Sequence, residues 1–186
     1  MEGENGYLGE LAQLMRKRNE IDNYISNIIN RPSEKWHIFE YIAYKLFPIK
    51  LNESASEGGH DGIFTDGDLI GKKVDIKYYA INNHLIDLNP QVDKDTYLLI
   101  FTGPYEPALS SKGKTRPMHI DKIHLFNEKM LCDQLNNRVK VGIATRVKSE
   151  YWEGKEIYPE NQWNINLKLK IDELKLLIEK MNKVDL

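Results

Sequence analysis

The chain has 186 residues, of which 41% are hydrophobic and 29% charged, so it suits one compact domain that can bury a substantial core. The formal net charge of −2 argues against binding of nucleic acid by bulk electrostatic attraction, although a local patch can still contact phosphates. The single cysteine, Cys132, excludes an intramolecular disulfide and a cysteine-rich zinc site, and the lack of a signal peptide or long apolar run predicts a cytoplasmic protein without membrane partners.

The first predicted element is a long helix over residues 7–29, in which apolar residues recur with a three-then-four spacing. Those residues are Leu11, Leu14, Ile21, Ile25 and Ile28, and Arg18 interrupts the row. The helix ends at Pro32, because a proline disfavours helical geometry at the residue before it. We therefore expect residues 1–32 to form a helical arm on a single domain of residues 33–186. The apolar face of the arm must be covered, either by that domain or by a second chain.

A second helix is predicted over residues 34–47, with Ser33 as its N-cap and Pro48 after its end. At 100° per residue, one face of this helix is apolar. It consists of Trp36, Phe39, Ile42, Ala43, Leu46 and Phe47. Glu40 falls on the flank of that face, half turned toward the core. Residues 49–51 are predicted to form the first strand, and residues 53–60 a flexible approach to the next one.

Residues 58–79, which read GGHDGIFTDGDLIGKKVDIKYY, are typical of a β-hairpin. The Asp-Gly pair at residues 66–67 is a strong turn signal between two apolar strands. In an antiparallel pair whose loop centres on Asp68, residues equally far from that centre face each other. Asp61 and Asp75 are equally far from it, so we expect the two aspartates to lie opposite one another.

Side chains alternate along a strand, so Asp75 and Lys77 share one face while Val74 and Ile76 point to the other. The carboxylates of Asp61 and Asp75 thus converge with one ammonium group. Like charges on a half-buried hairpin repel and lose hydration, so such a pair needs a compensating cation. A hard divalent ion bound through oxygens, such as Mg²⁺, meets that need. Lys77 beside it can orient an attacking water or neutralise charge on a phosphate.

Asp61, followed after the loop by Asp75-Ile76-Lys77, resembles the PD-(D/E)xK signature of the restriction-endonuclease-like nuclease superfamily. The resemblance covers residues 36–101, and His60 stands where a proline often precedes the first aspartate. It implies a Mg²⁺-dependent DNA endonuclease, with Mn²⁺ as a substitute ion. Asp61, Asp75 and the backbone carbonyl of Ile76 would bind the metal, and Lys77 would assist the water.

The resemblance also implies an α/β fold with a mixed central β-sheet flanked by helices, and double-stranded DNA as substrate. Cutting both strands is simplest with two symmetry-related sites, so a homodimer is expected. Nucleases of this kind often take a further acid from the helix before the hairpin, and Glu40 is that residue here. Glu53 or Glu57 could replace it, and the alternative role for Glu40 is a boundary glutamate paired with a lysine.

The D/E-x-K tripeptide by itself is weak support, because it recurs at residues 153–155 and 173–175. Of the three copies, the one at Asp75 lies inside an apolar strand with a second acid at hairpin distance. The structural alternative is an exposed hairpin in which Asp61 and Asp75 pair with Lys72 and Lys73.

Contacts to nucleic acid are predicted at two places. Residues 110–116 carry three cations, Lys112, Lys114 and Arg116, among small residues that permit close backbone approach, although an ordinary solvated loop fits equally well. His60 could contact a phosphate or act in proton transfer. A type II restriction endonuclease is the leading hypothesis, and a repair or junction nuclease is the alternative within the nucleases. The alternative from another class is a non-catalytic module that binds DNA or protein on a nuclease-like scaffold.

The rest of the chain completes the predicted sheet and its helices. Residues 78–90 read as a polar connection, 95–102 as a central strand covered on both faces, 118–126 and 139–147 as further strands, and 165–171 as an alternating strand. Asn127 is predicted to cap a helix that ends at Leu135, and Asp172 to cap a final helix. The aromatic residues of 151–163 could stack on bases, form a dimer contact or cover a core edge.

Overall fold

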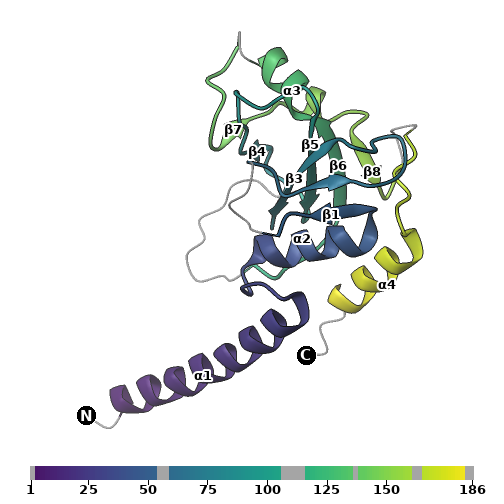
Figure 1. The fold of residues 1–186 in the computed structure, drawn as a ribbon. Helices are drawn as coiled ribbons and strands as arrows, with labels where there is room; N and C mark the ends of the chain where they lie inside the picture. The colour runs from purple at the N-terminus through teal and green to yellow at the C-terminus, as the bar shows by residue number, and fades with distance from the viewer. Residues whose placement is uncertain (1–2, 54–58, 106–115, 136–137, 161–164, 183–186) are drawn as a thin grey trace.

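The computed structural model describes residues 3–53, 59–105, 116–135, 138–160 and 165–182 (Figure 1). The helices are α1 (Gly3–Ile29), α2 (Lys35–Leu46), α3 (Glu128–Leu135) and α4 (Ile171–Asn182), with a short 3-10 helix, η1 (Ser149–Tyr151). The strands are β1 (Ile49–Leu51), β2 (Gly62–Phe64), β3 (Lys73–Tyr79), β4 (Leu85–Ile86), β5 (Thr96–Thr102), β6 (Lys122–Asn127), β7 (Thr145–Arg146) and β8 (Glu156–Tyr158). None of the helices in these ranges has the length and apolar character of a membrane span.

The central sheet has six strands in the order β1-β2-β3-β5-β6-β8. Strands β3 and β5 pair in parallel, and every other neighbouring pair is antiparallel. A separate two-stranded sheet joins β4 to β7. The predicted α/β class, with a mixed central sheet flanked by helices, is confirmed.

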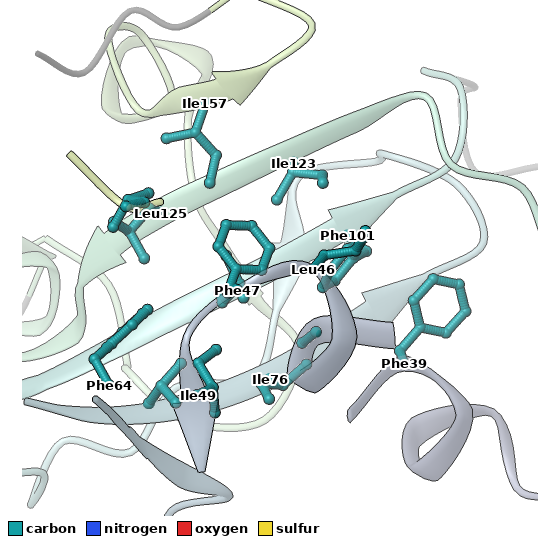
Figure 2. Close-up of a cluster of buried hydrophobic side chains, with 14 of the residues drawn as sticks. Phe39, Leu46, Phe47, Ile49, Phe64, Ile76, Phe101, Ile123, Leu125 and Ile157 are labelled. Atoms are coloured by element: carbon teal, nitrogen blue, oxygen red, sulfur yellow. The ribbon is translucent and has the colours of Figure 1, made fainter. Parts of the chain in front are cut away.

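Two hydrophobic clusters lie on opposite faces of the sheet. Helices α2 and α4 cover one face, where Phe39 and Phe47 pack against sheet residues that include Ile76 and Leu125 (Figure 2). Helix α3 and β4 cover the other face, together with Trp152. Strand β5 supplies both clusters, because its side chains alternate between them, and this explains its unbroken apolar run.

The predicted hairpin is confirmed in both position and register. Gly62 pairs with Val74 and Ile63 with Lys73, so the next residues outward, Asp61 and Asp75, are opposite each other. Gly67 has a φ of 78°, and a Cβ there would lie 2.4 Å from the Asn166 carbonyl oxygen, so the turn requires glycine.

The helices form where they were predicted, although α1 begins at Gly3 rather than at residue 7 and two of the predicted caps are wrong. The Asn127 side chain accepts a hydrogen bond from the Met130 amide at 2.9 Å and caps α3 as expected. Ser33 does not cap α2, because the chain stays extended through Glu34, which occupies the N-cap position without a side-chain bond. Helix α4 already begins at Ile171, so Asp172 lies within its first turn rather than before it.

Two strand predictions in the second half of the chain are wrong, and one strand was not predicted. Of residues 139–147, only Thr145–Arg146 form a strand. Residues 165–170 form no strand, although Leu167 is buried; the Asn166 carbonyl accepts a bond from the Asp68 amide, so this segment packs over the hairpin loop. The last strand of the sheet is instead β8, in the aromatic segment.

Helix α1 extends away from the rest of the molecule (Figure 1). Leu11, Leu14 and Ile21 on this helix are 51%, 55% and 60% exposed, whereas Ile29 at its end is buried. The described part of the domain therefore leaves most of the apolar face of α1 uncovered.

Candidate active site

The site forms where the pairing of β2 with β3 stops. Beyond Gly62 and Val74, the Ile76 amide donates to the carboxylate Oδ2 of Asp61 at 2.6 Å instead of to a β2 carbonyl. The Asp61 amide in turn donates to the Val74 carbonyl at 2.9 Å. The backbone amide and the side-chain carboxylate of Asp61 are thus both bonded to β3, beside Asp75.

Asp75 and Lys77 lie on the same face of β3, as expected from strand alternation. The ammonium Nζ of Lys77 donates to Asp75 Oδ1 at 2.8 Å, and the two side chains are 33% and 17% exposed. Burial alone would lower the pKa of Lys77, but the charges of Asp75 and then Asp61 outweigh it and raise that pKa. Lys77 is therefore a cation at neutral pH, and the alternative pairing of the aspartates with Lys72 and Lys73 is wrong, since those lysines bind Asp95 and Asp93.

The carboxylate of Asp61 is the most perturbed acid of this group. Burial, followed by the negative charge of Asp75, raises the pKa of Asp61 to about 7, even though the Ile76 amide favours the ionised form. Glu40 adds a smaller repulsion. Two ionised aspartates at this place therefore require more positive charge than Lys77 supplies.

Glu40 is buried and lies in the same cavity, about 400 Å³ in volume, as Asp61, Ile76 and Lys77. Its Oε2 accepts a hydrogen bond from Arg31, and His37 Nδ1 lies 3.3 Å from the same oxygen. The partner of this glutamate is thus an arginine at the end of the helical arm, and not the lysine of the alternative prediction.

Glu53 is not brought into this cavity. It follows the end of β1, is exposed, and lines a separate hollow with Arg31 and Lys50 beside the end of α1. Glu57 lies outside the described residues. Of the three acids considered on the N-terminal side of the hairpin, Glu40 is the one that the described structure places next to Asp61.

The predicted DNA contacts are placed only in part. Arg116 lines a cavity of about 430 Å³ that shares Trp36, Tyr78 and Tyr79 with the first cavity, so the two hollows adjoin. Lys112 and Lys114 lie outside the described residues. His60 is half-buried, and its backbone carbonyl accepts a hydrogen bond from the Asn52 side chain at 2.7 Å.

Glu128 was missed by the sequence reasoning. It is the first residue of α3, only 1% exposed, and burial, followed by the charge of Asp75, raises its pKa to about 7. The Asn89 amide donates to its Oε1 at 2.8 Å. An acid in the first turn is common in helices, so its position in the sequence does not mark Glu128 as a site residue. Only the sheet topology brings Glu128 near Asp75 and Lys77.

The carboxylate oxygens of Asp61 and Asp75 suit a hard divalent cation better than a transition metal. Within the described ranges, no cluster of three or more histidine, cysteine, aspartate or glutamate side chains is arranged to hold a metal ion. Mg²⁺ is commonly bound by only one or two carboxylates, with water and substrate phosphate completing its octahedron. Asp61 and Asp75, whose mutual repulsion a cation would relieve, fit that requirement.

Comparison with protein-family models, with curated proteins and with solved structures finds no match for this chain.

Proposed function

We propose that this chain is a Mg²⁺-dependent DNA endonuclease that hydrolyses phosphodiester bonds, and that it is of the type II restriction kind. The observation that carries the proposal is the hairpin register, which puts Asp61 opposite Asp75, with Lys77 Nζ 2.8 Å from the Asp75 carboxylate. Asp61 and Lys77 line a cavity of about 400 Å³, and Asp75 is joined to it through its bond to Lys77. Repair or junction cleavage would use the same site with other loops.

Asp61, Asp75 and the Ile76 carbonyl would hold Mg²⁺, or Mn²⁺ in its place. The bound ion would lower the pKa of the attacking water and stabilise the negative charge that develops on phosphorus. Asp61 has its carboxylate fixed by the Ile76 amide, so one ligand is already oriented. Asp75 forms an ion pair with Lys77, so the lysine would lie beside the bound metal.

Lys77 would orient the water and neutralise charge on the phosphate. Its raised pKa means that it stays protonated, so it donates hydrogen bonds and does not accept the proton of the water. Glu40 is the accessory acid, held in orientation by Arg31 and His37. In the adjoining cavity, Trp36, which is 55% exposed, and Arg116 would contact the DNA.

A second candidate is a non-catalytic module that binds DNA or protein on the same scaffold. One observation favours it: the chain's own cations already pair with two of the acids, Lys77 with Asp75 and Arg31 with Glu40. Such pairing can stabilise a site that never binds a metal. This candidate predicts that no activity depends on Asp75 or Lys77.

The two candidates are separated by incubating plasmid and branched DNA with the chain and Mg²⁺. The variants are Asp75→Ala and, as a matched control, Glu173→Ala, an exposed acid in the D/E-x-K tripeptide on α4. Defined fragments that disappear with Asp75→Ala support restriction, and cuts that require a branch support junction cleavage. Absence of metal-dependent cleavage on every substrate overturns the nuclease proposal and favours the binding module.

A further inference from the structure

Apolar residues recur along α1 alternately three and four positions apart. They are Tyr7, Leu11, Leu14, Ile21, Ile25 and Ile28, with Arg18 at the polar position between Leu14 and Ile21; we call this set the α1 seam. The mean interval of 3.5 residues is that of a coiled coil, in which a narrow stripe faces a partner helix. Leu8 and Met15, which follow the seam residues Tyr7 and Leu14 and are 66% and 58% exposed, widen the stripe on one flank.

The described part of the chain does not cover the α1 seam. Tyr7, Leu14 and Ile21 are 75%, 55% and 60% exposed, and α1 leads away from the domain (Figure 1). Among the described residues, the attachment to the domain lies at the end of the helix, where Ile29 is buried and Arg31 bonds to Glu40 and to the Asn52 carbonyl. Helices in proteins owe most of their stability to packing of an apolar face, so a helix about 40 Å long needs a partner.

We propose that the α1 seam packs against the α1 seam of a second copy of this chain, as a parallel two-stranded coiled coil. In a parallel pair each seam residue meets its own equivalent, so the apolar positions form layers on both sides of Arg18. The exposed stripe runs for about 32 Å at 1.5 Å per residue, so nearly the whole arm is in contact. A self-complementary stripe of this kind fits an identical partner best.

The charges beside the seam favour the parallel arrangement. Lys17 comes directly before the Arg18 position, and Asp22 comes directly after Ile21, on the two flanks of the stripe. In a parallel pair these flanking positions of opposite helices come together, so Lys17 of each copy faces Asp22 of the other. An antiparallel pair brings like flanks together and makes neither ion pair.

Arg18 then has a role at the centre of the seam. Its side chain is 82% exposed, and its Nε lies 3.5 Å from Asp22 Oδ2 on the same helix, so the guanidinium is drawn toward the rim. A single polar residue in an otherwise apolar seam lowers the stability of the pair but fixes its register and number of chains. The parallel pairing also places both domains at the same end of the arm.

The oligomeric state of the full chain tests this proposal without reference to activity. Sedimentation equilibrium is expected to give a dimer of 43.4 kDa, twice the 21.7 kDa of one chain. The double variant Leu14→Glu, Ile21→Glu is expected to give only the single-chain mass. The matched control Asn19→Glu, Asn23→Glu places the same charges on the exposed opposite side of α1 and should remain dimeric. A monomeric native chain, or a dimer that survives the seam variant, overturns the proposal.

Two further variants test the parallel pairing of the two helices. They also test the proposal if the double glutamate variant fails to form helix α1. Arg18→Leu should tighten the dimer by at least about tenfold, since it removes the polar layer, whereas a solvent-facing helix would show no change. Leu14→Cys should cross-link to itself on oxidation, because equivalent positions meet; the native Cys132 is buried. Cross-links that form only between Leu14→Cys and Ile25→Cys chains contradict the parallel arrangement.

Discussion

Asp61 lies opposite Asp75 at the open end of the β2–β3 pair, and burial together with the charge of Asp75 raises the pKa of Asp61 to about 7. Without a cation, ionising both acids therefore lowers the stability of the folded chain. A bound divalent ion would reverse that effect.

Asp61→Asn should stabilise the metal-free protein, and more at pH 8 than at pH 5. The folded pKa of Asp61 is raised to about 7 from an ordinary value of 3.8, so its contribution to stability is lost as pH rises through this range. At pH 8 the free energy of unfolding should rise by on the order of 2–4 kcal/mol. The side-chain oxygen of the new asparagine can still accept the hydrogen bond from the Ile76 backbone amide, but it carries no charge. Urea unfolding at both pH values measures this rise. A variant less stable than the native chain at pH 8 contradicts the assigned repulsion.

Lys77→Met should lower the cleavage rate by roughly a hundredfold or more while metal binding persists. The ammonium group is expected to act on water and phosphate, and loss of one such charge commonly has an effect of this size. Lys175→Met, which changes the exposed lysine of the D/E-x-K tripeptide on α4, is the matched control and should retain the native rate. Single-turnover rates at saturating Mg²⁺ provide the comparison; equal rates for both variants would remove Lys77 from the site.

Arg31→Gln should destabilise the fold by about 3–5 kcal/mol, because it leaves the buried carboxylate of Glu40 without its cation. The double variant with Glu40→Gln should recover most of that loss. Unfolding free energies of the native chain, both single variants and the double variant form a double-mutant cycle. Additive losses would mean that the arm is not attached through this pair.

His124→Leu should remove an acid-sensitive step in stability. Burial lowers the pKa of His124 to about 4, only partly offset by Glu156, and neither ring nitrogen has a hydrogen-bond partner among the described residues. The unfolded chain therefore binds a proton near pH 6.5 that the folded chain does not, and stability falls as pH drops from 6.5 toward 4. The difference between variant and native unfolding free energies should grow in favour of the variant by up to about 3 kcal/mol over this range. A constant difference between pH 7 and pH 4.5 would contradict it.

Local sequence signals predicted the hairpin and the centre of the sheet. The Asp66-Gly67 turn fixed the register of Asp61 and Asp75, and the continuous apolar run of β5 reflects burial on both faces. The alternating pattern of residues 165–171 led to a wrong strand prediction. An extended segment that packs Leu167 on the core shows the same alternation as a strand, although it pairs with no neighbouring strand in the described part of the chain. Pairing depends on neighbours far along the chain, which a local pattern does not report.

The same distinction separates the predicted site residues from those that were missed. Asp61, Asp75 and Lys77 belong to one hairpin, so a turn and strand alternation were enough to bring them together. Glu128 reaches them only through the order of β3, β5 and β6, and Arg31 reaches Glu40 only through the path of the chain between α1 and α2. Local patterns of residue spacing therefore could not predict these contacts between distant segments.

Calorimetric titration with Mg²⁺ and Mn²⁺, in the presence of duplex DNA, tests most directly whether Asp61 and Asp75 form one cation site. The native chain should bind the ion more tightly at pH 8 than at pH 6 and release a proton on binding, because the ion favours the ionised form of Asp61. Asp61→Asn and Asp75→Asn should each abolish binding, whereas Asp66→Asn, in the exposed turn of the same hairpin, should not. Equal binding by all four proteins, or no binding by the native chain, would contradict the account.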